Sequence, residues 1–78
     1  MAITLNHTIV PAKDKQASAQ FFADIFGLQV KAGDGRFAQV QVNATLTMDY
    51  DQLRPVVESL HYAFHVSDTE FDDIYARV

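Results

Sequence analysis

The sequence predicts an α+β fold in which a complete βαβββ module is followed by the βα start of a second module. Three observations carry this prediction. They are segments of β-branched and alternating residues, two segments with apolar residues at helical spacing, and a partial internal repeat. With 78 residues, 49% of them hydrophobic, the chain is long enough for one small core and therefore for a single domain.

The first strand and the first helix are predicted from local signals. Residues 3–10 are rich in β-branched side chains and are followed by Pro11, which is typical of a strand that stops there. Asp14 is suited to cap a helix, and Gly27 stands where a helix C-cap is expected. We expect this helix to bury a wide aromatic face. The apolar residues at helical spacing are Ala17, Phe21, Phe22, Ile25 and Phe26.

A hairpin and a further strand are predicted next. Residues 28–32 alternate up to Gly33-Asp34-Gly35, which favours a hairpin turn, and residues 38–42 form the return strand. Residues 45–50 alternate strictly, so one face should meet the helix. The expected helix-facing residues are Leu46, Met48 and Tyr50, and those of the opposite face are Thr45, Thr47 and Asp49.

The remaining residues are expected to begin a second module. Residues 51–59 contain Pro55 and read as a connector, and residues 60–66 are expected to form another strand. Ser67 to Glu70 has the pattern of a capping box, which predicts that a second helix starts there. The predicted organisation is one partial domain over 1–78, with a first module at 1–50, a connector at 51–59 and the second module from 60 to 78.

An internal repeat links the two modules. The segment from His7 to Asp14 matches the segment from His61 to Asp68, with His and Asp at the same separation. Residues 22–26 likewise match residues 71–75. Two matched stretches in the same order, each on the same predicted element, indicate a duplication that is cut short.

Composition excludes several classes of function. The net charge is −4 and the six Lys and Arg residues are scattered, so no basic stripe is available for nucleic acid or for anionic membranes. The N-terminus lacks the features of a secretory signal, and no apolar stretch reaches the length of a membrane span, which favours a cytoplasmic protein. The absence of cysteine rules out thiol catalysis and Cys-ligated zinc.

Three segments carry a resemblance to a known family. LNHTIVPAKD, FFADIFGLQV and LHYAFHVSD are similar to the strand and helix segments of paired βαβββ modules in the glyoxalase, bleomycin-resistance and dioxygenase (vicinal oxygen chelate) superfamily. The resemblance implies an open, curved sheet whose two halves enclose a cavity for a metal or a small ligand. The last three strands of the second module are missing, so either a longer parent exists or another copy supplies the rest.

The resemblance implies that His7 and His61 are metal ligands, because histidines at these two strand positions bind the ion in metal-dependent members. Imidazole suits Fe²⁺, Zn²⁺, Ni²⁺ or Mn²⁺. The other interpretation of each histidine is a polar residue that lines a cavity or forms a hydrogen bond in the core.

A carboxylate ligand is harder to assign. The glyoxalase I branch places a glutamate where this chain has Thr47, and Asp49 lies two positions along the same predicted face. Asp49 is thus either a metal ligand or a solvated polar residue at a strand end. The extradiol dioxygenase branch takes its glutamate from the part of the second module that this chain lacks.

Two further residues have an ordinary and a functional interpretation. His65 lies two strand positions from His61 and is a candidate proton shuttle or outer partner of a ligand, or simply a histidine at the solvent edge. Arg36 follows the predicted turn, where it would meet an anionic substrate or only improve solubility.

The leading hypothesis is a divalent-metal-dependent dioxygenase or lyase that acts on a small molecule with vicinal oxygens. The alternatives are a metal-free protein that sequesters a small ligand, as in the bleomycin-resistance branch, and an inactive fragment. A homodimer is expected, because a chain this short has a small core and exposed strand edges.

Overall fold

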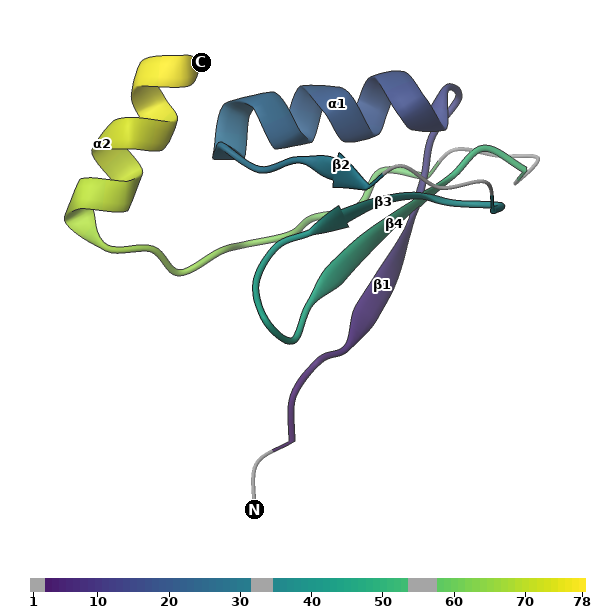
Figure 1. The fold of residues 1–78 in the computed structure, drawn as a ribbon, viewed down its shortest axis with the longest axis horizontal. Helices are drawn as coiled ribbons and strands as arrows, with labels where there is room; N and C mark the ends of the chain where they lie inside the picture. The colour runs from purple at the N-terminus through teal and green to yellow at the C-terminus, as the bar shows by residue number, and fades with distance from the viewer. Residues whose placement is uncertain (1–2, 32–34, 54–57) are drawn as a thin grey trace.

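The computed structural model describes residues 3–31, 35–53 and 58–78, and these form a four-stranded sheet and two helices (Figure 1). The order of elements confirms the predicted α+β class. The strands are β1 (His7–Pro11), β2 (Val30–Lys31), β3 (Ala38–Gln41) and β4 (Thr47–Asp51), and the helices are α1 (Lys15–Phe26) and α2 (Asp68–Arg77). None of the helices in these residues is long and apolar enough to cross a membrane.

The sheet has the strand order β1-β4-β3-β2, with α1 covering one face (Figure 1). β1 runs parallel to β4, whereas β4 with β3 and β3 with β2 are antiparallel. The parallel β1–β4 pair places His7 opposite Thr47 and Ile9 opposite Asp49. Residues paired in register point to the same side of a sheet, so this register decides which side chains share a face.

Helix α1 begins and ends at the residues that the sequence indicates. The Asp14 carboxylate accepts a hydrogen bond from the Ala17 amide at 3.1 Å, which satisfies one of the free amides of the first turn. Gly27 adopts the left-handed conformation with φ of 72°, and its amide donates to the Ala23 carbonyl. Both predicted caps are confirmed.

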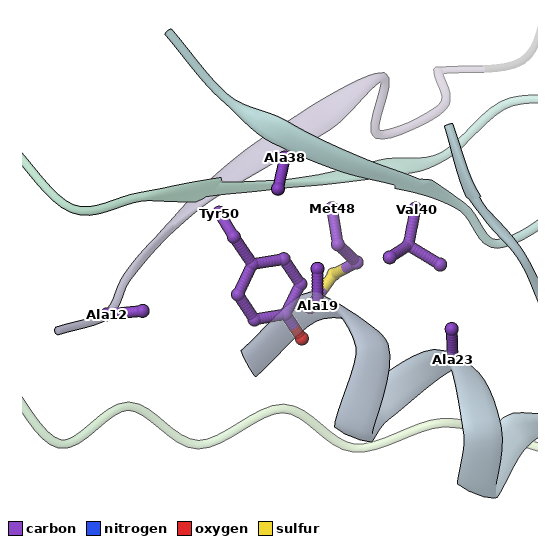
Figure 2. Packing of buried hydrophobic residues seen from close by; sticks show 7 residues of the cluster. All are labelled: Ala12, Ala19, Ala23, Ala38, Val40, Met48 and Tyr50. Atoms are coloured by element: carbon purple, nitrogen blue, oxygen red, sulfur yellow. The ribbon is translucent and has the colours of Figure 1, made fainter. Parts of the chain in front are cut away.

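The core lies between α1 and the sheet, and alanines determine how closely the two layers approach (Figure 2). Ala19 and Ala23 are completely buried against Val40, Met48 and Tyr50, because methyl side chains allow the helix backbone to come near the strands. Met48 and Tyr50 therefore face the helix as predicted.

The expected aromatic face of α1 is only partly buried. Phe22 and Phe26 stack with ring centroids 4.5 Å apart, and Phe22 packs against the core. Phe21 is 69% exposed, which contradicts the prediction for this residue. The two alanines, and not all the phenylalanines, occupy the line of closest contact with the sheet.

The first strand is shorter than predicted and includes Pro11. Residues 3–6 form no strand, and β1 covers residues 7–11. Proline lacks an amide donor, which an edge strand tolerates because, among the described residues, β1 pairs with a strand on one side only. The ladder continues past Pro11, since the Ala12 amide donates to the Asp51 carbonyl at 2.9 Å.

The strand expected at residues 60–66 is not formed, and the whole segment 58–67 lacks regular strand structure (Figure 1). Side chains hold this segment instead. The Phe64 ring lies 5.8 Å from Phe22 and 5.2 Å from Phe26, and the Tyr62 hydroxyl lies 3.2 Å from Oγ1 of Thr8. Alternating side chains predict a strand only where a neighbouring backbone completes the ladder, and the strands described here do not pair with this segment.

Helix α2 has the predicted capping box. The Ser67 side chain accepts from the Glu70 amide at 3.1 Å, and the Glu70 carboxylate accepts from the Ser67 amide at 2.9 Å. Arg77 then donates to the Ile25 carbonyl at 3.3 Å, so α2 reaches back to the end of α1. The turn predicted at Gly33-Asp34-Gly35 lies partly outside the described residues, and Pro55 of the connector lies wholly outside them.

Candidate functional site

The face of the sheet opposite α1 is polar, and we call it the polar face. Register places on it Ile9 and Pro11 of β1 and seven polar residues: His7 from β1, Lys31 from β2, Gln39 and Gln41 from β3, and Thr47, Asp49 and Asp51 from β4. Two of these carry buried carboxylates, because Asp49 is 5% exposed and Asp51 has no exposed surface. Buried carboxylates require hydrogen-bond partners and are incompatible with a purely apolar covering layer. This face is therefore suited to a polar site.

Side chains on β3 and β4 form two hydrogen-bonded pairs across this face. Oγ1 of Thr47 donates to Oε1 of Gln41 at 3.2 Å. One step along, Nε2 of Gln39 donates to Oδ1 of Asp49 at 3.1 Å. Pairs directly opposite each other on one face stabilise a sheet, and these two also fix the directions of the polar groups that they contain.

Asp49 lies in the middle of β4, where it is buried, so its interpretation as a solvated residue at a strand end is wrong. The strand continues to Asp51, and Gln39 covers the carboxylate from β3. Within the described residues, Oδ1 takes the Gln39 hydrogen bond and Oδ2 receives none. One oxygen of this carboxylate is thus left for another ligand.

Asp51 and Arg36 form an ion pair at the end of the polar face. Nη2 and Nε of Arg36 donate to the two carboxylate oxygens at 2.8 and 3.3 Å. The hydrogen bond and the charge of Asp51 raise the pKa of the Arg36 guanidinium above its ordinary value. Nζ of Lys15 also donates to the Arg36 carbonyl at 2.8 Å, so α1 holds the backbone of this arginine.

Arg36 is therefore a structural partner of a buried carboxylate, which the interpretation as a solubilising residue missed. The sequence prediction places Asp51 in the connector and gives Gln39 and Gln41 no function. The signal that would have found them is the period of two in both strands, which places each on the side away from the helix.

His7 lies at the start of β1 on the polar face, opposite Thr47. Its side chain is exposed, and Nδ1 is 2.8 Å from Oδ1 of Asn6. Asp49 is one step further along the same face, opposite Ile9. The structure thus brings His7 and the predicted carboxylate ligand Asp49 onto one face of neighbouring strands.

His61 is exposed in the segment that follows the connector. The adjacent Tyr62 contacts Thr8, which is itself adjacent to His7. His7 and His61 are therefore each next in sequence to one of the two residues that form this contact. No group of three or more His, Cys, Asp or Glu side chains is placed to hold a metal ion within residues 3–31, 35–53 and 58–78.

His65 lies elsewhere, in a cleft of about 330 Å³ at the start of α2. Glu70 lines the same cleft, and its pKa is lowered chiefly by hydrogen bonds from Ser67, with a smaller contribution from the charge of His65. Leu46 and Phe26 form part of the apolar lining. The structure therefore groups His65 with the cap of α2.

A second hollow lies on the helix side of the sheet. This groove of about 650 Å³ runs between α1 and the end of β1, and Phe21, Phe22 and Tyr50 line it. Burial, together with the charge of Tyr62, raises the pKa of Tyr50 to about 12. The lining is mainly apolar and contains neither of the two predicted metal-binding histidines.

Two solved structures are similar to this chain over nearly all of its length. Oxidase ChaP-H2 is 47% identical over 99% of this chain with a TM-score of 0.88, and oxidase ChaP-H1 is 47% identical over 97% with a TM-score of 0.86. The chain spans 61% of the length of each oxidase, which is less than two thirds. No family model and no curated protein matches it.

Proposed function

We propose that this chain is part of a domain of the glyoxalase, bleomycin-resistance and dioxygenase type that oxidises a small molecule with the help of a divalent metal ion. The observation that carries the proposal is the polar face, where His7 and the buried carboxylate of Asp49 lie on the neighbouring strands β1 and β4. The 47% identity to two proteins named oxidases supports the oxidative chemistry.

The donor atoms are of the type that such an ion requires. His7 and His61 offer imidazole nitrogens, and Asp49 offers the oxygen that Gln39 leaves free. Two imidazoles and one carboxylate are a common ligand set for Fe²⁺ and related ions that keep open positions for substrate. Zn²⁺, Ni²⁺ and Mn²⁺ accept the same donor types.

In the proposed reaction the metal ion and the side chains of the polar face have different roles. A bound ion would act as a Lewis acid toward neighbouring oxygens of the substrate. Thr47 and Gln41 would line the floor beside His7, where their polar groups orient a substrate that bears hydroxyl or carbonyl groups. The buried Asp49 would add negative charge, which favours a cation at this position.

Elemental analysis of gently purified protein tests the proposal. We expect a stoichiometric transition metal in the wild type and its loss in His7→Ala and in His61→Ala. His65→Ala is the matched control, because this histidine is also exposed but lies beside α2, and it should retain the metal. Equal metal content in all four proteins, or none in the wild type, would refute the assignment.

A metal-free binding protein is the second candidate, and the residue opposite His7 favours it. Thr47 stands where the glyoxalase I branch has a glutamate, and its hydroxyl is already bonded to Gln41. A small-molecule ligand that binds equally well with and without a chelator would support this candidate. Loss of binding on chelation would exclude it.

We also propose that the chain functions as a homodimer. The core of the described residues is small, since only Val40, Met48 and Tyr50 among its buried apolar side chains are larger than alanine. Phe71 and Tyr75 of α2 remain 58% and 72% exposed. Sedimentation equilibrium should give twice the chain mass, and a cooperatively folded monomer would contradict the proposal.

A further inference from the structure

The contact between His7 and Asn6 favours one of the two neutral tautomers of the His7 ring. Nδ1 of His7 lies 2.8 Å from Oδ1 of Asn6, and an amide oxygen only accepts hydrogen bonds. A neutral His7 ring can therefore form this bond only when its proton is on Nδ1. Nε2 then carries a lone pair, which is the group that binds a metal ion.

Asn6 is held in place by the sheet, although it precedes β1. The Thr47 amide donates to the Asn6 carbonyl at 3.0 Å, which extends the β1–β4 pairing by one residue. His7, the next residue, is itself opposite Thr47 in the ladder. A fixed backbone limits where the short Asn6 side chain reaches, so its oxygen stays beside the imidazole.

The second predicted ligand on the polar face has an amide partner of the same kind. Gln39 donates to Oδ1 of Asp49 at 3.1 Å, and this bond leaves Oδ2 without a donor among the described residues. In both cases an uncharged side-chain amide forms a hydrogen bond with one atom of the predicted metal ligand. The second nitrogen or oxygen atom of that ligand is left available for a metal ion. Outer partners of this kind orient the ligands of metal sites and are important for affinity.

We propose that Asn6 is a positioning residue that holds His7 as the Nδ1–H tautomer and so presents Nε2 to a metal ion. The role of the ion rests on the function proposed above, whereas the tautomer does not. Asn6 makes no contact with the ion and acts only through His7.

The tautomer is measured first, by nitrogen-15 NMR of the His7 ring in the metal-free full chain at a pH of about 8.5. We expect Nδ1–H in the wild type and a shift toward Nε2–H in Asn6→Ala. Asn6→Asp should retain Nδ1–H, because its carboxylate is also an acceptor. Thr4→Ala is the matched surface control and should resemble the wild type. An Nε2–H wild type, or an unchanged tautomer in Asn6→Ala, would overturn the inference.

Zinc titration then tests the consequence for binding. Loss of such an outer partner typically weakens metal affinity by ~10-fold or more, so we expect that loss in Asn6→Ala and near wild-type affinity in Asn6→Asp. Unchanged zinc affinity in Asn6→Ala despite an altered tautomer would refute the positioning role. If His7→Ala binds zinc as well as the wild type, the proposed metal site itself fails, and the tautomer result still decides the bond to Asn6.

Discussion

Asp51 has no exposed surface, and its carboxylate accepts two hydrogen bonds from the half-exposed side chain of Arg36, at 2.8 and 3.3 Å. The two partners are unequal, because water can solvate the arginine in the folded protein but cannot reach the aspartate. Lys15 further restrains this corner through its bond to the Arg36 carbonyl. The ion pair between Asp51 and Arg36 thus stabilises the end of the polar face.

Removing the arginine should therefore be more harmful than neutralising the aspartate. In Arg36→Gln the buried Asp51 carboxylate loses both hydrogen bonds to the guanidinium, which we expect to cost about 2 kcal/mol of unfolding free energy. Asp51→Asn leaves an arginine that water can solvate and should cost less. Urea unfolding of both variants measures the difference, and an equal or opposite order would contradict the account.

The burial of Tyr50 predicts a loss of stability in alkali. Its pKa is raised from 10.0 to about 12, so the neutral form is favoured in the folded state. Burial of the neutral Tyr50 hydroxyl contributes to the free energy of unfolding. This contribution is fully present well below pH 10, where the tyrosine of the unfolded chain is also neutral, and it is lost as the pH rises through about 12. Each pKa unit corresponds to ~1.4 kcal/mol for a fully buried group, but Tyr50 lines an open groove where solvent screens part of the effect, so the loss should be about 1–2 kcal/mol.

Tyr50→Phe serves as the control, because phenylalanine keeps the ring and removes the ionisable group. The difference in urea midpoint between the wild type and Tyr50→Phe should change across this pH range. A difference that stays constant from neutral pH to pH 12 would show that Tyr50 titrates normally.

The end of α1 predicts a cost for any side chain at Gly27. Its φ of 72° is unfavourable for alanine, and an added Cβ would lie 2.9 Å from the Arg77 guanidinium, which bonds to Ile25. The arginine is flexible and would move, so we expect Gly27→Ala to destabilise the fold by about 1 kcal/mol, mainly through backbone strain. Gly35→Ala is the matched control, because nothing lies within 4 Å of its added Cβ. Thermal unfolding midpoints that fall equally in both variants would refute this explanation.

Local signals in the sequence were sufficient for the helices. Asp14, Gly27 and the pair Ser67 and Glu70 cap helices through bonds to backbone groups only three or four residues away. The alternation over residues 45–50 likewise identified the faces of Met48 and Asp49 correctly, because a period of two requires no knowledge of the partner strand.

The errors concern features that depend on distant residues. The burial of Asp51 depends on how far β4 extends and on Arg36, which is 15 residues away. Whether residues 60–66 form a strand depends on a neighbouring backbone, and alternation alone does not supply one. The exposure of Phe21 follows from the choice of Ala19 and Ala23 as the line of contact with the sheet.

A divalent ion bound at the polar face can be located by the paramagnetic broadening that Mn²⁺ causes in NMR spectra. Amide signals of His7, Thr47 and Asp49 should broaden at low Mn²⁺ concentration, while those of α1 on the opposite face of the sheet remain sharp. The pattern should disappear in His7→Ala. Broadening centred on the acidic residues of α2, or broadening that His7→Ala leaves unchanged, would contradict the account.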